Sequence, residues 1–183
     1  NDFQTVNAGL TSHLCDLIRS EYFATKSKKK IILASSMQAE LENAYGRSKI
    51  QAEGSVYDLA MDINNSCTVF RFPGVFGKWC KPNYNSVVAT FCHNIAHDLP
   101  IEISDPSKEI TLVYIDDVVE AIIREIESSS TGYITASVNP EYQISLENLA
   151  NSIYAFAKGR KNLITEKVGL GFQRALYSTF ISF

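Results

Sequence analysis

Residues Ile31 to Lys49 read IILASSMQAELENAYGRSK, and this pattern indicates a buried strand that leads into a helix. Ile31 to Ser35 is a short apolar run of the kind found in strands covered on both faces. A polar loop follows from Met37 to Ala44, and a helix is expected from Tyr45 to about Asn64. A strand whose carboxyl end feeds a helix is the repeating unit of α/β proteins, so this stretch predicts that class.

Tyr45 and Lys49 are candidates for a catalytic pair. They lie four residues apart and therefore on one face of the expected helix. Tyrosine has a reference pKa of about 10, so it is a weak acid at neutral pH unless a neighbouring cation stabilises its phenolate. Lys49 can supply that cation. Ser35 and Ser36 end the preceding strand and can place a hydroxyl near the same substrate oxygen. The alternatives are an exposed tyrosine beside a solvated lysine, and serines that only cap a strand.

The rest of the chain alternates between strand-like and helix-like segments. It opens on an apparent helix with Phe3, Val6, Leu10, Leu14 and Leu17 on one face. Further strands are expected at residues 68–72, 101–104, 110–115 and 133–138, and further helices at 86–97, 116–127 and 145–159. The alternation predicts a doubly wound α/β fold with a parallel sheet. Asp116 and Asp117 open the helix at 116–127, and helix capping explains them better than a functional carboxylate pair does.

Composition narrows the possible functions. The 183 residues include 45% hydrophobic residues, enough for a real core, and carry a formal net charge of −3, which disfavours nucleic acid as a partner. No stretch approaches the roughly 20 apolar residues of a membrane-spanning helix, and no signal segment opens the chain, so a cytoplasmic protein without a membrane partner is expected. The four scattered cysteines predict reduced thiols. His93 and His97, beside Cys92, have a metal-like spacing but no further ligand, so no metal is expected.

A glycine-rich turn between a strand and a helix, which dinucleotide cofactors require, is missing from this sequence. Gly169 to Gly171 is the nearest imitation, but no strand is expected before it and no third glycine follows. The chain therefore holds a proton-transfer pair without the segment that would bind the pyrophosphate.

The segments from Ser35 to Ala39 and from Tyr45 to Lys49 resemble the extended short-chain dehydrogenase/reductase superfamily, of the NAD-dependent epimerase/dehydratase type. The stretch from Phe76 to Cys92 and the segment Leu176 to Thr179 are similar to the capsular-polysaccharide reductases that complete UDP-N-acetyl-L-fucosamine synthesis. The resemblance implies a Rossmann-like core. It implies that residues 1–183 are part of one reductase domain, between an N-terminal nucleotide-binding unit and a C-terminal cupin domain. Residues 1–75 would end the core, and residues 76–183 would mostly bind substrate.

The resemblance also implies an activity, the reduction of a 4-keto sugar nucleotide, here a UDP-sugar, with NADP(H), although NAD(H) is possible. As a fragment, the chain is expected to be inactive alone. Tyr45 would protonate the carbonyl oxygen, Lys49 would lower the pKa of Tyr45 and hold the cofactor ribose, and Ser36 would bind the substrate oxygen. Pro73, Gly74 and Val75 would pass beside the nicotinamide.

Four further residues would line the substrate side: Lys78, Lys81, Asn83 and Asn85. An irregular surface loop is the other explanation for these four. Asn7 resembles a helix asparagine that orders the active-site strand in relatives. Many relatives carry Asn where this chain has Gly74. A homodimer is expected for the full-length protein. A sugar-nucleotide epimerase or dehydratase of the same superfamily, or a non-catalytic binding or scaffold relative, remains an alternative.

Overall fold

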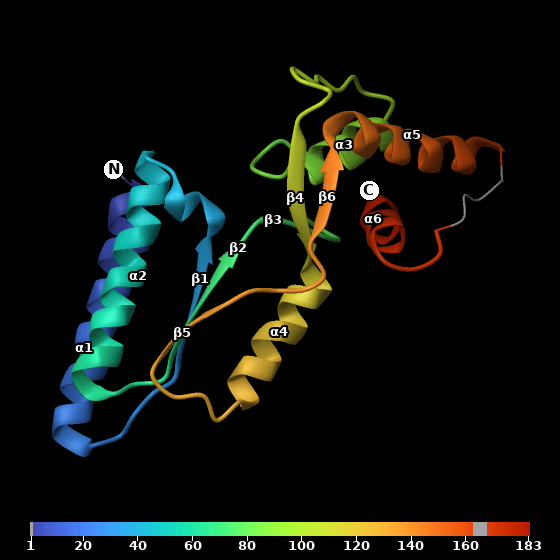
Figure 1. Cartoon of the computed structure of the whole chain (residues 1–183). Coiled ribbons are helices and arrows are strands. Elements are labelled where there is room, and N and C mark those ends of the chain that lie inside the picture. Colours follow the sequence, from blue (N-terminus) through green and yellow to red (C-terminus); the bar gives the residue numbers. More distant parts are fainter. Residues whose placement is uncertain (1, 163–167) are drawn as a thin grey trace. The chain divides into compact units, whose positions relative to one another are not determined.

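The structure is a computed structural model that describes residues 2–162 and 168–183, and it divides into two compact units (Figure 1). Unit 1 comprises Asn1–Pro73 and Val119–Val138, and unit 2 comprises Gly74–Val118 and Asn139–Phe183. Each unit has its own three-stranded sheet. Among the described residues, no helix is both long and apolar enough to cross a membrane.

Unit 1 is built on a parallel sheet with the strand order β1-β2-β5. The strands are β1 (Ile31–Ser36), β2 (Cys67–Phe72) and β5 (Tyr133–Ala136). In the ladder, Ile31 lies opposite Cys67, and Cys67 lies opposite Tyr133. Strands were expected from the sequence at all three positions, at residues 31–35, 68–72 and 133–138, and the parallel pairing confirms the predicted fold class.

Helices cover both faces of this sheet (Figure 1). One face carries α1 (Leu10–Thr25) and α2 (Ala44–Ile63), and the other carries the part of α4 (Ile115–Glu127) that belongs to unit 1. The core between the sheet and α1 and α2 includes Cys15, Ile18, Val56, Leu59 and Val69. The central strand β2 is buried from Cys67 to Phe70, as such covering predicts, whereas β1 lies at one edge of this sheet and only its Ile31 and Ser35 are buried.

The first helical segment differs from its expected orientation. A π-helix, η1 (Gln4–Gly9), precedes α1, and the buried residues of the two are Ala8, Cys15 and Ile18. The apolar residues that the spacing placed on one face are instead exposed in this chain: Phe3, Val6, Leu10, Leu14 and Leu17. The period therefore predicted the helix correctly, but the longest apolar side chains do not face the core of unit 1.

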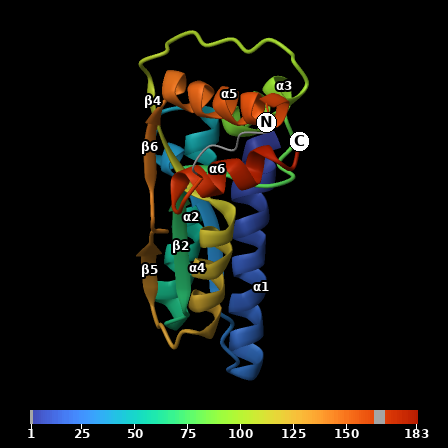
Figure 2. The same cartoon turned by 90° about the vertical axis from the view of Figure 1, so that its right-hand side faces the viewer.

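Unit 2 is built on a mixed sheet with the order β3-β4-β6. Its strands are β3 (Gly74–Phe76), β4 (Glu109–Tyr114) and β6 (Tyr142–Ser145), and its helices are α3 (Val87–Ala96), α5 (Leu146–Asn162) and α6 (Phe172–Phe180). The pairing of β3 with β4 is parallel, whereas β6 runs antiparallel to β4. Figure 2 shows α5 and α6 beside each other, and they pack with α3 around a core that includes Phe76, Leu149, Ile153, Leu176 and Phe180.

Three expectations about unit 2 were wrong. Residues 101–104 form no strand, because Ile101 and Ile103 pack against the core without a ladder partner. Residues 74–76 were expected to begin a loop after Pro73, but they form β3 by pairing with β4. The strand β6 was not expected, and it makes the sheet mixed rather than wholly parallel. Short strands of this kind depend on a partner from elsewhere in the chain, which local patterns do not show.

Candidate functional site

The start of α2 fixes the position of Tyr45. Asn43 caps this helix, since its side-chain oxygen accepts a hydrogen bond of 2.7 Å from the Gly46 backbone N–H. Gly46 permits a close approach: a Cβ atom there would lie 2.3 Å from the Gln38 carbonyl oxygen and 2.4 Å from that of Leu41. The helix entrance is therefore packed against the loop that leads from β1, and Tyr45 and Lys49 follow on one helix face.

Lys49 reaches from α2 to the carboxyl end of β1. Its Nζ donates a hydrogen bond of 3.1 Å to the Ala34 carbonyl oxygen and lies 5.6 Å from the centroid of the Tyr45 ring. Burial lowers the pKa of Lys49 below its usual value, and the negative charge of Glu53 acts in the opposite direction. The ammonium is thus placed beside the tyrosine, where its charge can favour the phenolate.

The two serines at the end of β1 have different surroundings. Ser35 is buried and its Oγ donates to Glu53 Oε1 at 2.5 Å. Ser36 is half-buried, and its Oγ accepts a hydrogen bond of 3.2 Å from the Gln38 backbone N–H at the start of η2 (Met37–Glu40). Because the Ser35 hydroxyl is already engaged with a buried carboxylate, Ser36 is the better candidate for contact with a substrate oxygen.

The N-terminal segment supports the helix that carries Tyr45. Asn7, in the π-helix η1, donates from Nδ2 to Ser48 Oγ at 3.0 Å, and the Ser48 hydroxyl donates to the Tyr45 carbonyl oxygen at 2.7 Å. The ring of Phe3 packs edge-on against the Tyr45 ring, with centroids 5.4 Å apart. Asn7 therefore contacts α2, whereas the family resemblance suggested that it orders the active-site strand.

The segment predicted to pass beside the nicotinamide spans the boundary between the units. Pro73 is the last residue of this part of unit 1, and Gly74 and Val75 begin β3 in unit 2. A Cβ atom on Gly74 would lie 2.9 Å from Leu112 Cδ2 and 3.2 Å from the Thr111 carbonyl oxygen. This close approach of β4 gives a physical reason for glycine at this position, where the family resemblance had implied asparagine.

The predicted substrate residues lie in the loop between β3 and α3. The loop contains two non-glycine residues with positive φ, Trp79 at 62° and Asn83 at 53°. Lys81 is exposed and its Nζ lies 5.5 Å from the centroid of the Tyr84 ring. The Asn83 backbone N–H donates to Thr90 Oγ1 at 3.0 Å, and Asn85 is exposed.

Lys78 differs from these three because it lines a cavity of about 450 Å³ within unit 2. Its ammonium lies 4.0 Å from Asp116. Burial, followed by the charge of Asp116, raises the pKa of Tyr114 to about 12, so this phenol remains protonated. The cavity is lined by Lys78, Tyr114, Asp116, Asp117, Tyr142, Gly171, Arg174, Ala175 and Ser178. Lys81, Asn83 and Asn85 are not part of this lining.

Arg174 is a candidate binding residue that sequence reasoning missed. It lies in the first turn of α6 and adds a second cation to the cavity that Lys78 lines. A signal for it is present in the sequence: Arg174 and Ser178 are four residues apart, while Phe172, Leu176 and Phe180 form the apolar face of the same helix. A polar pair opposite an apolar face is common on surface helices, so its spacing alone does not indicate a site.

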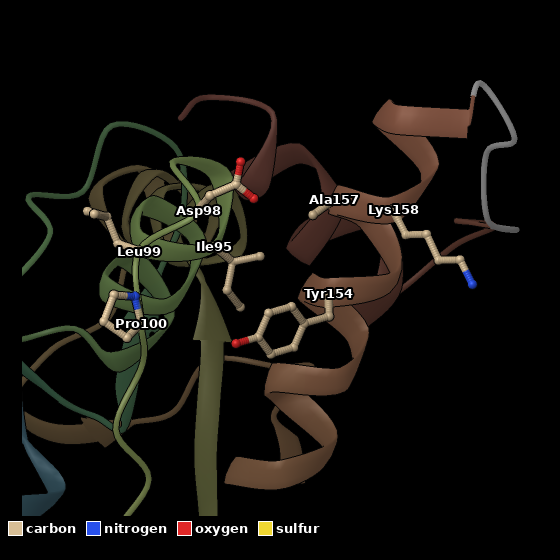
Figure 3. A pocket seen from close by; sticks show the side chains of 7 residues that line it. All are labelled: Ile95, Asp98, Leu99, Pro100, Tyr154, Ala157 and Lys158. Atoms are coloured by element: carbon tan, nitrogen blue, oxygen red, sulfur yellow. The ribbon is translucent and has the colours of Figure 1, made fainter.

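A second cavity of unit 2, of about 490 Å³, lies between the end of α3 and α5 (Figure 3). It contains none of the residues predicted for catalysis or binding. Its lining is mainly apolar, with Asp98 and Lys158 as the charged members, and comprises Ile95, Asp98, Leu99, Pro100, Tyr154, Ala157 and Lys158. We assign it no role in the chemistry.

The histidines and cysteines show ordinary packing. The rings of His93 and His97 stack with centroids 4.5 Å apart. Among the residues that the structure describes, no group of three or more His, Cys, Asp or Glu side chains has the geometry of a metal site. All four cysteines are free thiols, and burial raises the pKa of Cys92 to about 12.

This geometry agrees with a family comparison. A profile of the NAD dependent epimerase/dehydratase family matches residues 1–139, which include the helix α2 with Tyr45 and Lys49. The chain belongs to this family. The family's name connects it with a nicotinamide cofactor and with epimerase or dehydratase chemistry, as expected from the sequence.

Two relatives of this family cover nearly the whole chain. UDP-2-acetamido-2,6-beta-L-arabino-hexul-4-ose reductase from Pseudomonas aeruginosa is 47% identical over 182 residues, which are 100% of this chain and 48% of the relative. The crystal structure of the capsular polysaccharide assembling protein CapF from Staphylococcus aureus has a TM-score of 0.82 at 36% identity, covering 94% of this chain and 47% of that one. The chain thus spans about half the length of these relatives.

A solved structure of much lower sequence identity shares the fold. UDP-glucuronic acid 4-epimerase from Bacillus cereus, in complex with UDP-glucuronic acid and NAD, has a TM-score of 0.78 at 13% identity and covers 97% of this chain and 67% of that one. At this identity the likeness is evidence for the fold alone. It supports the Rossmann-like α/β architecture.

Proposed function

We propose that the full-length protein reduces a 4-keto UDP-sugar with NADPH, in a pathway of the UDP-N-acetyl-L-fucosamine type; NADH is the other possible reductant. The observation that carries this proposal is the placement of Tyr45 and Lys49 on one face of α2, with Lys49 bonded to the end of β1. The 47% identity to UDP-2-acetamido-2,6-beta-L-arabino-hexul-4-ose reductase supports the choice of substrate class.

In this reaction Tyr45 donates its phenolic proton to the carbonyl oxygen as that oxygen gains negative charge. The Lys49 ammonium lowers the energy of the phenolate that remains. Ser36 donates a hydrogen bond to the same oxygen, since its hydroxyl is a donor as well as the acceptor for Gln38. All three side chains belong to unit 1.

The residues present fit the nicotinamide half of the cofactor. The Lys49 ammonium has three N–H groups and gives one to Ala34, which leaves donors for the ribose hydroxyls. Backbone groups of Pro73, Gly74 and Val75 would bind the carboxamide. When bound, the cofactor supplies the hydride that reduces the carbonyl carbon.

For the substrate, the cavity of unit 2 supports a site for the diphosphate. Lys78 and Arg174 bring two cations to it, beside the carboxylates of Asp116 and Asp117 in the same lining. Phosphate groups are bound by such cationic side chains. Tyr114 and Ser178 add hydroxyl donors. Lys81, Asn83 and Asn85 would contact the remainder of the UDP-sugar from the exposed loop.

The proposal is tested by Tyr45→Phe in the full-length enzyme, since this change removes the proton donor and keeps the ring. We expect a loss of kcat of about a thousandfold or more, with NADPH affinity nearly unchanged. Stopped-flow absorbance of NADPH measures turnover, and fluorescence titration measures cofactor binding. Near-normal turnover of Tyr45→Phe would exclude this tyrosine as the acid.

The family name favours a second candidate, a sugar-nucleotide epimerase or dehydratase. These reactions return the hydride to the substrate, whereas a reductase consumes one NADPH for each product molecule. Measuring NADPH oxidised per sugar converted separates the two. A protein that binds the sugar nucleotide and converts none would indicate a binding or scaffold role.

We also propose that the full-length protein is a cytoplasmic homodimer. Its free thiols suit a reducing compartment. Unit 1 exposes large apolar side chains on both α1 and α2, which favours burial against a second copy. These side chains are Leu10, Leu14, Leu17, Phe23, Ile50, Tyr57 and Met61.

A further inference from the structure

Glu53 is the only charged residue that is buried among the described side chains, at 3% exposure. It lies on α2, one helical turn after Lys49 and two turns after Tyr45. Burying a carboxylate is costly unless the charge is paired and hydrogen-bonded. A buried acid beside the catalytic pair therefore calls for an explanation from its contacts.

Its carboxylate is held from two neighbouring strands. The Ser35 hydroxyl of β1 donates to Oε1 at 2.5 Å. The guanidinium of Arg71 on β2 donates from Nε to both carboxylate oxygens at 3.0 and 3.1 Å, and from its NH2 nitrogen to Oε2 at 2.6 Å. Ser35 and Arg71 are direct partners in the β1–β2 ladder. The two donors are thus fixed to each other by the sheet, and Glu53 has a single defined position.

Adjacent residues of β1 bind adjacent turns of α2. The Ala34 carbonyl oxygen accepts from Lys49, and the next residue, Ser35, donates to Glu53. These two contacts attach α2 to the carboxyl end of β1 immediately before Ser36. A displacement of either contact would move Lys49 relative to the proposed substrate hydroxyl.

The charges around Lys49 and Glu53 come from four elements. Tyr45 is on α2, Arg71 on β2, Glu40 on η2 and Tyr133 on β5. Glu40 contacts the same guanidinium as Glu53, at 3.0 Å, but its side chain is 70% exposed. The hydrogen bond to Glu53 raises the pKa of Arg71, and burial, together with the charge of Glu53, raises that of Tyr133. For Lys49, burial disfavours the charged form and Glu53 is the opposing influence.

We propose that Glu53 is a positioning residue of this site: held by Ser35 and Arg71, its carboxylate lies one helical turn from Lys49, favours the ammonium form of that residue and keeps α2 fixed to the end of β1. The catalytic consequence rests on the proposed reductase function. The electrostatic part does not, because it concerns the protonation of Lys49 in the protein itself.

The test is the titration of Lys49 in the full-length protein, followed by carbon NMR of lysine labelled at Cε. Lys49→Arg identifies the signal by its loss. In Glu53→Gln the side chain keeps its shape and an acceptor for Ser35 but loses its charge, so the Lys49 titration is expected to move to lower pH. An unchanged or raised midpoint overturns the inference.

Glu40→Gln is the matched control, because it removes a carboxylate from the same guanidinium at an exposed position. The midpoint of the Lys49 titration in Glu40→Gln is expected to equal that of the wild type. An equal shift of the midpoint in Glu40→Gln and Glu53→Gln would contradict a specific role for Glu53. Glu53→Asp keeps the charge but withdraws it by one methylene. If Glu53→Gln does not fold, Glu53→Asp is expected to give a lower midpoint than the wild type, and equality with the wild type overturns the inference.

Activity supplies the second measurement. In Glu53→Gln, the alkaline limb of the pH profile of kcat is expected to move to lower pH. At pH values on this limb, kcat is expected to be about three- to tenfold lower than in the wild type. A uniform loss at all pH values, without a shift of the limb, would indicate a purely structural role and contradict the proposal. A shifted Lys49 titration in a protein that reduces no 4-keto sugar would instead refute the proposed function and leave the inference standing.

Discussion

Unit 1 holds its candidate catalytic residues on regular elements, whereas unit 2 holds most of its predicted substrate residues in an irregular loop. Tyr45 and Lys49 are placed by the period of α2 and by contacts with β1. Lys81 and Asn83 follow the backbone of the loop between β3 and α3, where Asn83 has a positive φ. A proton donor needs a fixed position, and a helix packed on a sheet supplies one. Binding loops are commonly more variable in sequence and more mobile than the elements that they connect.

The largest effect is expected at the helix entrance of unit 1. In Gly46→Ala the new Cβ meets two backbone oxygens at 2.3 and 2.4 Å, so α2 or the preceding loop must move. We expect a loss of about 3 kcal/mol in the free energy of unfolding, measured by urea denaturation of the full-length protein. If Gly46→Ala left the free energy of unfolding unchanged, the candidate catalytic residues of unit 1 would not be held in a fixed position by the start of α2.

Gly54→Ala on the same helix is the control for that change. Nothing lies within 4 Å of a Cβ atom there. Because alanine favours helices over glycine, this variant is expected to gain about 0.5 to 1 kcal/mol. A loss in Gly54→Ala comparable with that of Gly46→Ala would show that any substitution in α2 is harmful.

An intermediate effect is expected where unit 1 would pair with a second copy. Leu14 is 47% exposed on α1, and Leu14→Glu would place a charge in the proposed dimer interface. We expect a weakening of about 2 kcal/mol in dimerisation, measured as the molar mass against concentration by light scattering. Leu170→Glu in unit 2, at a side chain that is 81% exposed, should leave the mass unchanged. A monomeric wild type would disprove the pairing.

The smallest effect is expected in the cavity of unit 2. Lys78→Met and Arg174→Met each remove a cation proposed to bind the diphosphate. We expect KM for the sugar nucleotide to rise about tenfold with kcat nearly unchanged, because this binding is the same in the ground and transition states. Lys81→Met, outside the cavity lining, should raise KM less. A fall in kcat without a change in KM would show that these residues act in the chemical step. Unit 2 would then not be limited to substrate binding.

Much of unit 1 was predictable from local patterns. The apolar run of β1, the capped start and end of α2 and the spacing of Tyr45 and Lys49 all depend on residues that are near each other in sequence. The choice of Ser36 over Ser35 came from the resemblance, and the engagement of Ser35 with Glu53 now supports it. The contact between Ser35 and Glu53 joins residues that are 18 positions apart, so no local sequence pattern predicts it.

Unit 2 was harder to predict, since its short strands exist only through pairing. The strand β3 has three residues and β6 has four, and both depend on β4. Ile101 and Ile103 alternate as in a strand but have no ladder partner. Arg174 joins Lys78 in one cavity although about half the chain separates them.

The sequence by itself determined the α/β class, the placement of Tyr45 and Lys49 on one face of α2 and the family, because these depend on helical period, strand hydrophobicity and a local motif. The tertiary structure decided which serine is engaged, which acid Ser35 and Arg71 hold, and which cation shares the cavity with Lys78. These features are set by contacts between residues distant in the chain. Such contacts form only when strands pair and helices pack, so the sequence carries no periodic signal for them.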